Sequence, residues 1–251
     1  MKRVGSFCKF LAYGILTAAA FLSSRTEAAV NKAVVRASIG ANQYSKDGGK
    51  TWQMVKVGNF FTPGTVIKTV DQGRVDLFLG DNGPVVRVTE STEMEVSKLD
   101  IDRTGVESVI DTELNLKSGR LQGNVRKLAA ASKYEIETPV GVAAVRGTEY
   151  DVSANGTVTC ISGTMVVFYR VNSVLDRSTG GTVVNAGQRA TPPPTGSNTV
   201  TVEQVSQREL QIFPDLKVTV VVVDVTTTPS TEPPVTSGTG TGQSTGGGNN
   251  N

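Results

Sequence analysis

Residues 136–152 read IETPVGVAAVRGTEYDV, and this segment decides the fold. Apolar side chains recur at every second position, as Tyr150 and Val152 do on either side of Asp151. That period is typical of a β-strand with one buried face. Pro139 fixes the backbone φ angle at a turn, and Gly141 lets another part of the chain approach closely. We therefore expect short β-strands here, joined by tight turns.

Gly147 predicts a bulge or corner that turns the chain into a strand over residues 148–152, which begins at Thr148. The guanidinium group of Arg146 has donors that could lock this corner to Glu149, to Asp151 or to a carbonyl oxygen. The other interpretation is that Arg146 faces a ligand. We expect the lock, because glycines and small residues around Arg146 indicate close backbone packing.

The same alternation extends outward over residues 33–190, for example in Val75 and Leu77 and again in Tyr134 and Ile136. Glycine-containing turn signals separate the runs, many of them about 8 to 12 residues apart or at multiples of that spacing. No window repeats apolar side chains at helical spacing. The sequence therefore predicts one all-β, antiparallel domain, built as a sandwich or as a short, solenoid-like β-stack.

Three consecutive prolines at 192–194 end this domain, because proline cannot donate to a sheet ladder. Residues 199–225 are predicted to be a short β-rich extension. It contains a strand at 199–205, one or two helical turns within 203–213, and a β-branched run at 216–225 that pairs back onto the main sheet. Residues 226–251 are rich in Thr, Ser, Gly, Pro and Asn, and we expect them to be disordered.

The N-terminus has the three parts of a secretory signal peptide. A basic start precedes an uncharged apolar stretch of 13 residues at 10–22, and Thr26-x-Ala28 offers a cleavage site before Ala29. A membrane-spanning helix needs about 20 apolar residues. We expect residues 1–28 to be removed, the protein to be exported, and the mature chain not to be inserted into a membrane.

Net charge and cysteine content limit the classes of binding partner that we expect. Residues 1–28 contain four basic residues and one acidic residue, so the chain total of +2 becomes −1 in the mature protein. This near-neutral balance predicts neither nucleic-acid binding nor a polybasic surface for anionic lipid. Cys160 is the only cysteine after residue 28, and we expect it to pack as a small apolar side chain in a strand.

The sequence gives little support for a catalytic function. The chain contains no histidine, which removes the commonest general base and most zinc sites. It also lacks a glycine-rich phosphate loop and a Gly-x-Ser-x-Gly elbow. We expect a protein that is not an enzyme and that needs no cofactor.

Two local motifs have a functional and a structural interpretation. Residues 45–52 resemble the Asp-box hairpin of sialidase-type propellers, but propellers need one copy per blade. Residues 100–111 place Asp100, Asp102, Thr104 and Asp111 at positions 1, 3, 5 and 12 of a calcium loop. Its flanks are strand-like and not helical. We expect a structural hairpin at both motifs, with the second as a weak calcium candidate.

Between Gly64 and Gln188, a series of motifs resembles the FecR domain family in its order. The matching segments are GTVIKT (64–69), GRVDLFLGDNG (73–83), VRV (86–88), STE (91–93), LKSG (116–119), IETPVGVAAVRGTEYDV (136–152), SGTMVV (162–167) and VNAGQ (184–188). The structural signature of the family falls on Pro139, Gly141, Arg146, Gly147 and Thr148.

The resemblance implies the periplasmic part of a sigma-factor regulator. Only nine residues precede the apolar N-terminal stretch, which leaves no room there for a cytoplasmic anti-sigma segment. We therefore expect a stand-alone FecR-like module in the periplasm or outside a Gram-negative-type cell. Its function would be to bind an envelope protein or polysaccharide, or to signal. The alternative is a structural component of the envelope or matrix, with residues 226–251 as a spacer.

Overall fold

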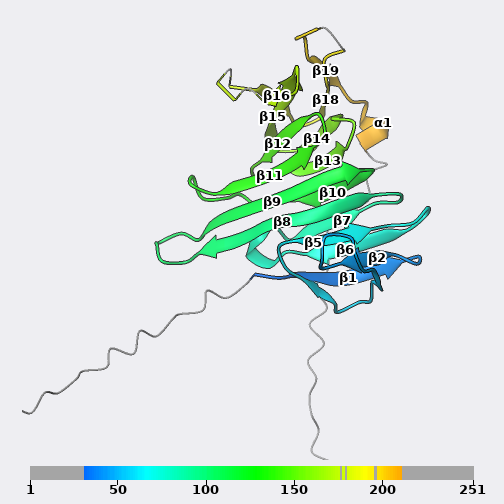
Figure 1. Cartoon of the computed structure of the whole chain (residues 1–251). Coiled ribbons are helices and arrows are strands. Elements are labelled where there is room, and N and C mark those ends of the chain that lie inside the picture. The colour runs from blue at the N-terminus through cyan, green and yellow to red at the C-terminus, as the bar shows by residue number, and fades with distance from the viewer. Residues whose placement is uncertain (1–30, 176, 179, 195–196, 211–251) are drawn as a thin grey trace, which may run out of the picture. The chain divides into compact units, whose positions relative to one another are not determined.

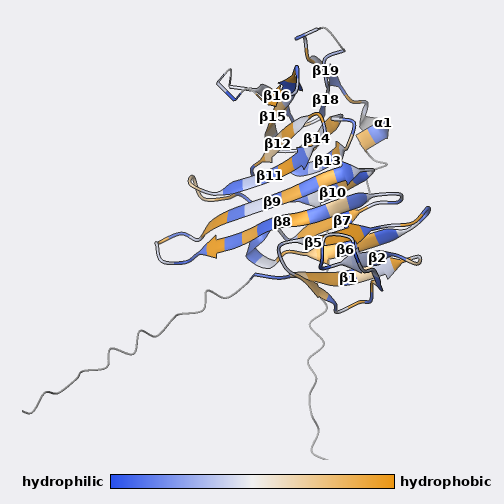
Figure 2. Ribbon diagram, viewed as in Figure 1, coloured by the Kyte–Doolittle hydropathy of each residue, from blue (hydrophilic) through white to orange (hydrophobic). Residues whose placement is uncertain are grey.

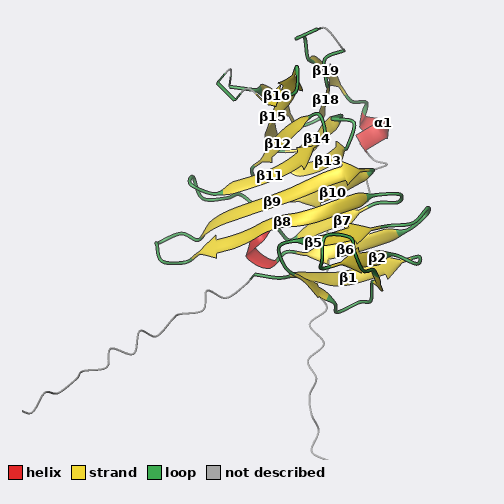
Figure 3. Cartoon of the chain, in the orientation of Figure 1, coloured by secondary structure: helices red, strands yellow, loops and turns green. Residues whose placement is uncertain are grey.

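The computed structural model describes residues 31–175, 177–178, 180–194 and 197–210. Nearly all regular structure in these ranges is β-strand, and the two helical elements are single turns, η1 (Gly80–Asn82) and α1 (Gln207–Leu210) (Figure 3). The prediction of an all-β fold is confirmed. In these ranges, no helix has the length and apolar character needed to cross a membrane.

The strands form two sheets (Figure 1). From edge to edge, the nine-stranded sheet contains β19 (Thr201–Gln204), β18 (Gln188–Thr191), β14 (Val158–Ser162), β13 (Glu149–Ser153), β10 (Arg120–Asn124), β7 (Val85–Val88), β6 (Arg74–Phe78), β1 (Ala33–Ile39) and β4 (Phe60–Phe61). The ten-stranded sheet contains β16 (Val174–Leu175), β15 (Thr164–Val171), β12 (Gly141–Val145), β11 (Lys133–Thr138), β9 (Val109–Ser118), β8 (Glu93–Asp102), β5 (Thr65–Lys68), β2 (Gln43–Ser45) and β3 (Gln53–Met54), with β17 (Thr182–Asn185) paired to β15.

The chain moves back and forth between the two sheets, so each sheet keeps its strands nearly in chain order. Strands β6 and β7 belong to the nine-stranded sheet, β8 and β9 to the other, β10 to the first again, and β11 and β12 to the second. This is the solenoid-like form of the predicted stack. Strands β9 and β11 are paired in parallel, because β10 carries the chain back through the other sheet between them.

One apolar core lies between the sheets. Alternate side chains of the longer strands point into it, so hydropathy changes from residue to residue along the ribbons (Figure 2). Tyr134 of β11 and Tyr150 of β13 meet there from opposite sheets, with their hydroxyl oxygens 3.0 Å apart. Burial raises the pKa of both tyrosines. Cys160 of β14 is also buried in this core, and burial raises the pKa of its thiol to about 11.

Residues 80–83, which include η1, form the link between β6 and β7. Asn82 is fully buried there, which the sequence did not indicate. Its Nδ2 donates to the carbonyl oxygen of Asp100, at 3.0 Å, and to Oγ1 of Thr112, at 2.8 Å. Asn82 therefore ties a turn of one sheet to strands of the other.

Beyond the three prolines, β19 pairs with β18 and extends the nine-stranded sheet, and α1 supplies one helical turn. The predicted signal peptide at 1–28, the β-branched run at 216–225 and the segment 226–251 lie outside the described residues.

Candidate functional site

The segment at 136–152 begins with the β11–β12 hairpin. Pro139 and Val140 form its turn, between the paired residues Thr138 and Gly141. Oγ1 of Thr138 donates to the carbonyl oxygen of Gly141 at 3.0 Å and accepts from its N–H at 3.1 Å. A Cβ atom on Gly141 would lie 2.4 Å from the carbonyl oxygen of Phe168, so a side chain has no room there.

The corner at Gly147 carries the chain from β12 to β13, and so from one sheet to the other. Gly147 has a φ angle of +70°, which L side chains rarely adopt. Gly163 forms a second corner, between β14 and β15, and a Cβ atom there would lie 2.3 Å from the carbonyl oxygen of Gly147. The buried Thr148 donates from Oγ1 to the carbonyl oxygen of Thr164 at 2.6 Å. The two corners thus pack directly against each other.

Arg146 contacts a carbonyl oxygen, one of the three kinds of partner that we expected, but it does not lock the corner from inside the fold. Its side chain is exposed, and Nη2 donates a long hydrogen bond of 3.5 Å to the carbonyl oxygen of Leu128. The reason is strand alternation: Val145 points into the core, so the next side chain points outward. Asp151, one of the expected partners, accepts hydrogen bonds from Arg120 and Gln122.

The candidate calcium loop is the end of the β8–β9 hairpin, where Asp100 and Asp111 are paired across the two strands. Oδ1 of Asp102 accepts from N–H and Oγ1 of Thr104, at 2.8 and 2.7 Å, and these bonds lower the pKa of Asp102. Nζ of Lys98 lies 2.5 Å from Oδ2 of Asp111 and 3.7 Å from Oδ2 of Asp100. A lysine therefore pairs with two of the four predicted ligands. Among the residues that the structure describes, no three His, Cys, Asp or Glu side chains are grouped as a metal site would need.

Residues 45–52 form the hairpin turn between β2 and β3. Oδ1 of Asp47 accepts hydrogen bonds from Oγ of Ser45, at 2.6 Å, and from the N–H groups of Lys50 and Thr51, at 3.0 and 2.9 Å. Its Oδ2 accepts from the hydroxyl of Thr51 at 2.6 Å. Together these bonds hold the pKa of Asp47 well below its usual range. The motif therefore has the structural role of closing a hairpin.

A row of polar side chains crosses the outer face of the nine-stranded sheet, and the sequence analysis did not find it. Its members are direct cross-strand partners on seven neighbouring strands. In order they are Asp76, Arg87, Gln122, Asp151, Thr159, Arg189 and Glu203.

Two buried carboxylates organise this row. Asp76 accepts from Arg87 at 2.8 Å (Nε to Oδ1) and 3.0 Å (Nη2 to Oδ2). Both carboxylate oxygens of Asp151 accept from Nε of Arg120, at 2.6 and 2.7 Å, and Oδ2 also accepts from Gln122 at 2.8 Å. Burial raises the pKa of Asp151, and the bonds from Arg120 and Gln122 oppose that rise. The two carboxylates hold the arginines in fixed positions.

A groove of about 530 Å³ opens on the same face, and we call it the arginine groove. Arg74, Arg87 and Arg120 line it together with Gln122. Nε of Arg74 is buried and makes no hydrogen bond within the described structure, while Oδ1 of Asp76 lies 3.6 Å from it. The groove therefore presents planar N–H donors, which suit oxygen acceptors such as carboxylates.

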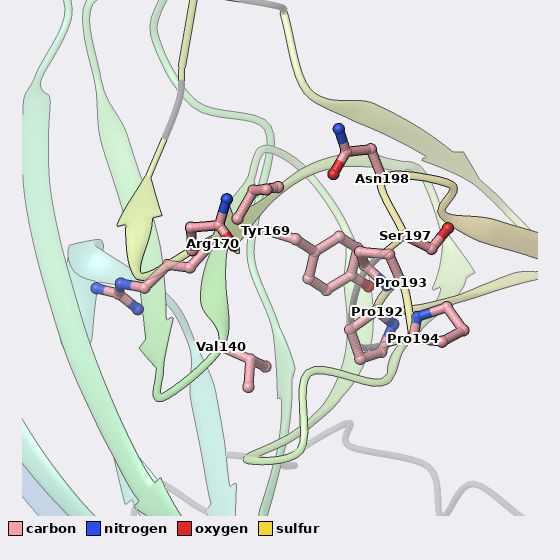
Figure 4. A pocket seen from close by; sticks show the side chains of 10 residues that line it. Val140, Tyr169, Arg170, Pro192, Pro193, Pro194, Ser197 and Asn198 are labelled. Carbon is pink, nitrogen blue, oxygen red and sulfur yellow. The ribbon is translucent and has the colours of Figure 1, made fainter.

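A second pocket, of about 410 Å³, lies where the Pro139–Val140 turn meets the three prolines at 192–194 (Figure 4). Its two largest polar side chains, those of Tyr169 and Arg170, are already hydrogen-bonded inside the fold. The hydroxyl of Tyr169 donates to the carbonyl oxygen of Gly156 at 2.9 Å. Arg170 donates to the carbonyl oxygen of Thr138 at 2.7 Å, and its guanidinium group points away from the prolines in Figure 4. The arginine groove is therefore the stronger candidate for a binding site.

Comparison with known proteins identifies the middle of the chain. Residues 65–165 match the family model described as FecR protein. The chain contains a FecR domain. The matched range includes β5 to β14, and with them the hairpin at Pro139, the corner at Gly147 and five of the nine strands of the sheet that bears the arginine groove. No curated protein matches the chain.

Two solved structures with partial similarity to the FecR-domain chain are crystal structures of a candidate anti-sigma factor from Parabacteroides distasonis ATCC 8503. The structure at 1.65 Å resolution is 13% identical with a TM-score of 0.42, and the one at 2.50 Å is 12% identical with a TM-score of 0.43. Each match covers 58% of this chain and 62% of the other. The chain thus spans less than two thirds of those proteins.

Proposed function

We propose that the chain is an exported, non-catalytic FecR-domain module that recognises an envelope protein or polysaccharide through the arginine groove. The observation that carries the proposal is the pairing of the buried Asp76 and Asp151 with Arg87 and Arg120 on the outer face of a sheet. Buried ion pairs are often no more stabilising than apolar side chains of similar volume. Their value here would be to orient the arginines for recognition.

The groove fits a ligand rich in oxygen acceptors. Guanidinium groups only donate hydrogen bonds, and their planar fork matches a carboxylate. Thr89 and Glu90 also line the groove and can accept from hydroxyl groups. An acidic polysaccharide and an acidic protein segment both combine these features.

A non-catalytic role is supported by how the acidic groups with shifted pKa values are used. Asp47 and Asp102 accept hydrogen bonds in hairpin turns, and Asp151 pairs with Arg120. These are structural or ligand-orienting roles. The absence of histidine from the sequence agrees with them.

Capture from an envelope fraction tests this function. Immobilised mature protein, residues 29–251, should retain a partner that high salt releases. Protease or periodate treatment of the fraction then tells a protein from a polysaccharide. Failure to retain any envelope component would contradict the proposal. N-terminal sequencing of the exported protein tests export separately, with Ala29 expected as the first residue and an intact Met1 in the membrane fraction as the contrary result.

A further inference from the structure

One end of the stack carries an uneven share of the charge. Residues 31–70 contain six lysines and arginines against one acidic residue, Asp47, which gives a net charge of +5. Residues 71–118 contain five basic and eleven acidic residues, which gives −6. The near-neutral total of the chain therefore conceals a strongly basic end.

Residues 53–61 place apolar side chains on that end. They run from β3, the last strand of one sheet, to β4, the last strand of the other. Val55 and Phe61 of this segment point into the core. Met54, Val57 and Phe60 face outward and are 48%, 65% and 49% exposed. Exposed apolar side chains clustered on one short segment indicate a contact surface.

Three lysines lie beside aromatic rings at this end, and one of them, Lys68, also pairs with Glu93 at 3.5 Å. Nζ of Lys32 and Nζ of Lys46 lie 4.7 and 4.9 Å from the centre of the Phe60 ring. Nζ of Lys68 lies 5.9 Å from the ring of Trp52. We call Lys32, Lys46, Lys68, Met54, Val57 and Phe60 the basic apolar end.

We propose that the basic apolar end docks the protein on an anionic lipid surface. Lysines near such a surface are attracted by its headgroups, and neighbouring apolar side chains enter the boundary between headgroups and acyl chains. A soluble polyanion would satisfy the lysines and leave Phe60 and Met54 in water, so the combination favours lipid. The site uses no residue of the arginine groove and is independent of the proposed function.

Vesicle co-sedimentation of mature protein tests the docking. We expect binding to vesicles of phosphatidylethanolamine with phosphatidylglycerol, weakening with salt, and little binding to pure phosphatidylcholine. Trp52 is the only tryptophan in the chain and belongs to this end, so its emission should shift to the blue on binding. Absence of binding to the anionic vesicles would overturn the proposal.

Variants separate lipid docking from a general attraction to anions. Lys32→Gln with Lys46→Gln should weaken binding about 25-fold, since each lysine contributes about fivefold. Phe60→Ser should weaken it about five- to tenfold. Lys127→Gln with Lys133→Gln removes two exposed lysines elsewhere and should change binding less than about twofold.

Arg74→Ala should leave vesicle binding unchanged, which keeps this test separate from that of the arginine groove. If Phe60→Ser binds as well as wild type while the lysine variant fails, the surface binds polyanions only and the lipid proposal is wrong. Melting temperatures close to that of wild type would show that the variants are folded.

Discussion

Arg87 and Asp76 face each other on β7 and β6 and are joined by two hydrogen bonds, of 2.8 and 3.0 Å, at a place where Asp76 is 6% exposed. Arg74 approaches the same carboxylate only to 3.6 Å. One buried acid thus has a tightly held and a loosely held arginine, and both arginines line the groove. Structural and ligand-binding roles can therefore be tested separately.

Replacing Arg87 should destabilise the fold. Arg87→Met would leave the buried carboxylate of Asp76 without its fork, and we expect the free energy of unfolding to fall by about 2 to 4 kcal/mol. Arg74→Ala is the matched control and should change it by less than about 0.5 kcal/mol, because its pairing is loose and partly exposed. Urea denaturation measures both free energies of unfolding. Equal losses for the two variants would contradict the assignment of Arg87 as the structural partner of Asp76.

The hydroxyl pair between Tyr134 and Tyr150 should behave as a coupled unit. Tyr150→Phe leaves the hydroxyl of Tyr134 buried without this partner, which should cost about 1 to 3 kcal/mol. The double variant with Tyr134→Phe removes both polar groups. Its loss of unfolding free energy should therefore be smaller than the sum of the losses of the two single variants. A thermodynamic cycle from chemical denaturation gives the coupling. Additive losses would mean that the hydroxyls do not interact.

Two substitutions at the packed corners should differ strongly in their effect on stability. Gly163→Ala would force a φ angle of +86° on alanine and place its Cβ atom 2.3 Å from the carbonyl oxygen of Gly147. We expect a loss of more than about 2 kcal/mol. Arg146→Ala removes an exposed side chain with one long hydrogen bond and should cost less than about 0.5 kcal/mol. A large loss of stability for Arg146→Ala would show that Arg146 locks the corner after all.

The hairpin at Asp47 should be sensitive to acid. Its folded-state pKa lies below the unfolded value of about 3.9, so folding favours the carboxylate. The stabilisation is present above the unfolded pKa and is lost as the pH falls toward the folded one. Asp47→Ala should therefore be less stable than wild type at pH 7, and the difference should shrink below about pH 4. Asp71→Ala, which removes another exposed acid, controls for the loss of charge.

Strands could be predicted from the sequence, but their distribution between the sheets could not. Val75 and Leu77, like Tyr134 and Ile136, show the period of two that any half-buried strand shows. Strands β9 and β10 are separated by Gly119 alone and yet belong to different sheets. The pattern of burial is the same for both sheets, so only the packed core decides which one a strand joins.

The polar row could not be predicted from the sequence for a similar reason. Asp76 and Asp151 are separated by 75 positions, and only the register of the intervening strands places them in one row. A signal was present, since each acid stands between two apolar residues of a strand and must point away from the core. Arg146 shows the opposite error, because the glycines and small residues around it suggested a packed side chain, whereas the alternation after Val145 points it outward.

The most direct test of the proposed binding function compares two arginine variants in the envelope capture experiment. Arg74→Ala removes a donor from the groove without disturbing the Arg87–Asp76 fork. Arg103→Ala removes an exposed arginine that pairs with Asp81 and does not line the groove. We predict that Arg74→Ala, folded to the same melting temperature, retains at least tenfold less partner than wild type, and that Arg103→Ala retains an equal amount. Equal retention by both variants would contradict recognition through the arginine groove.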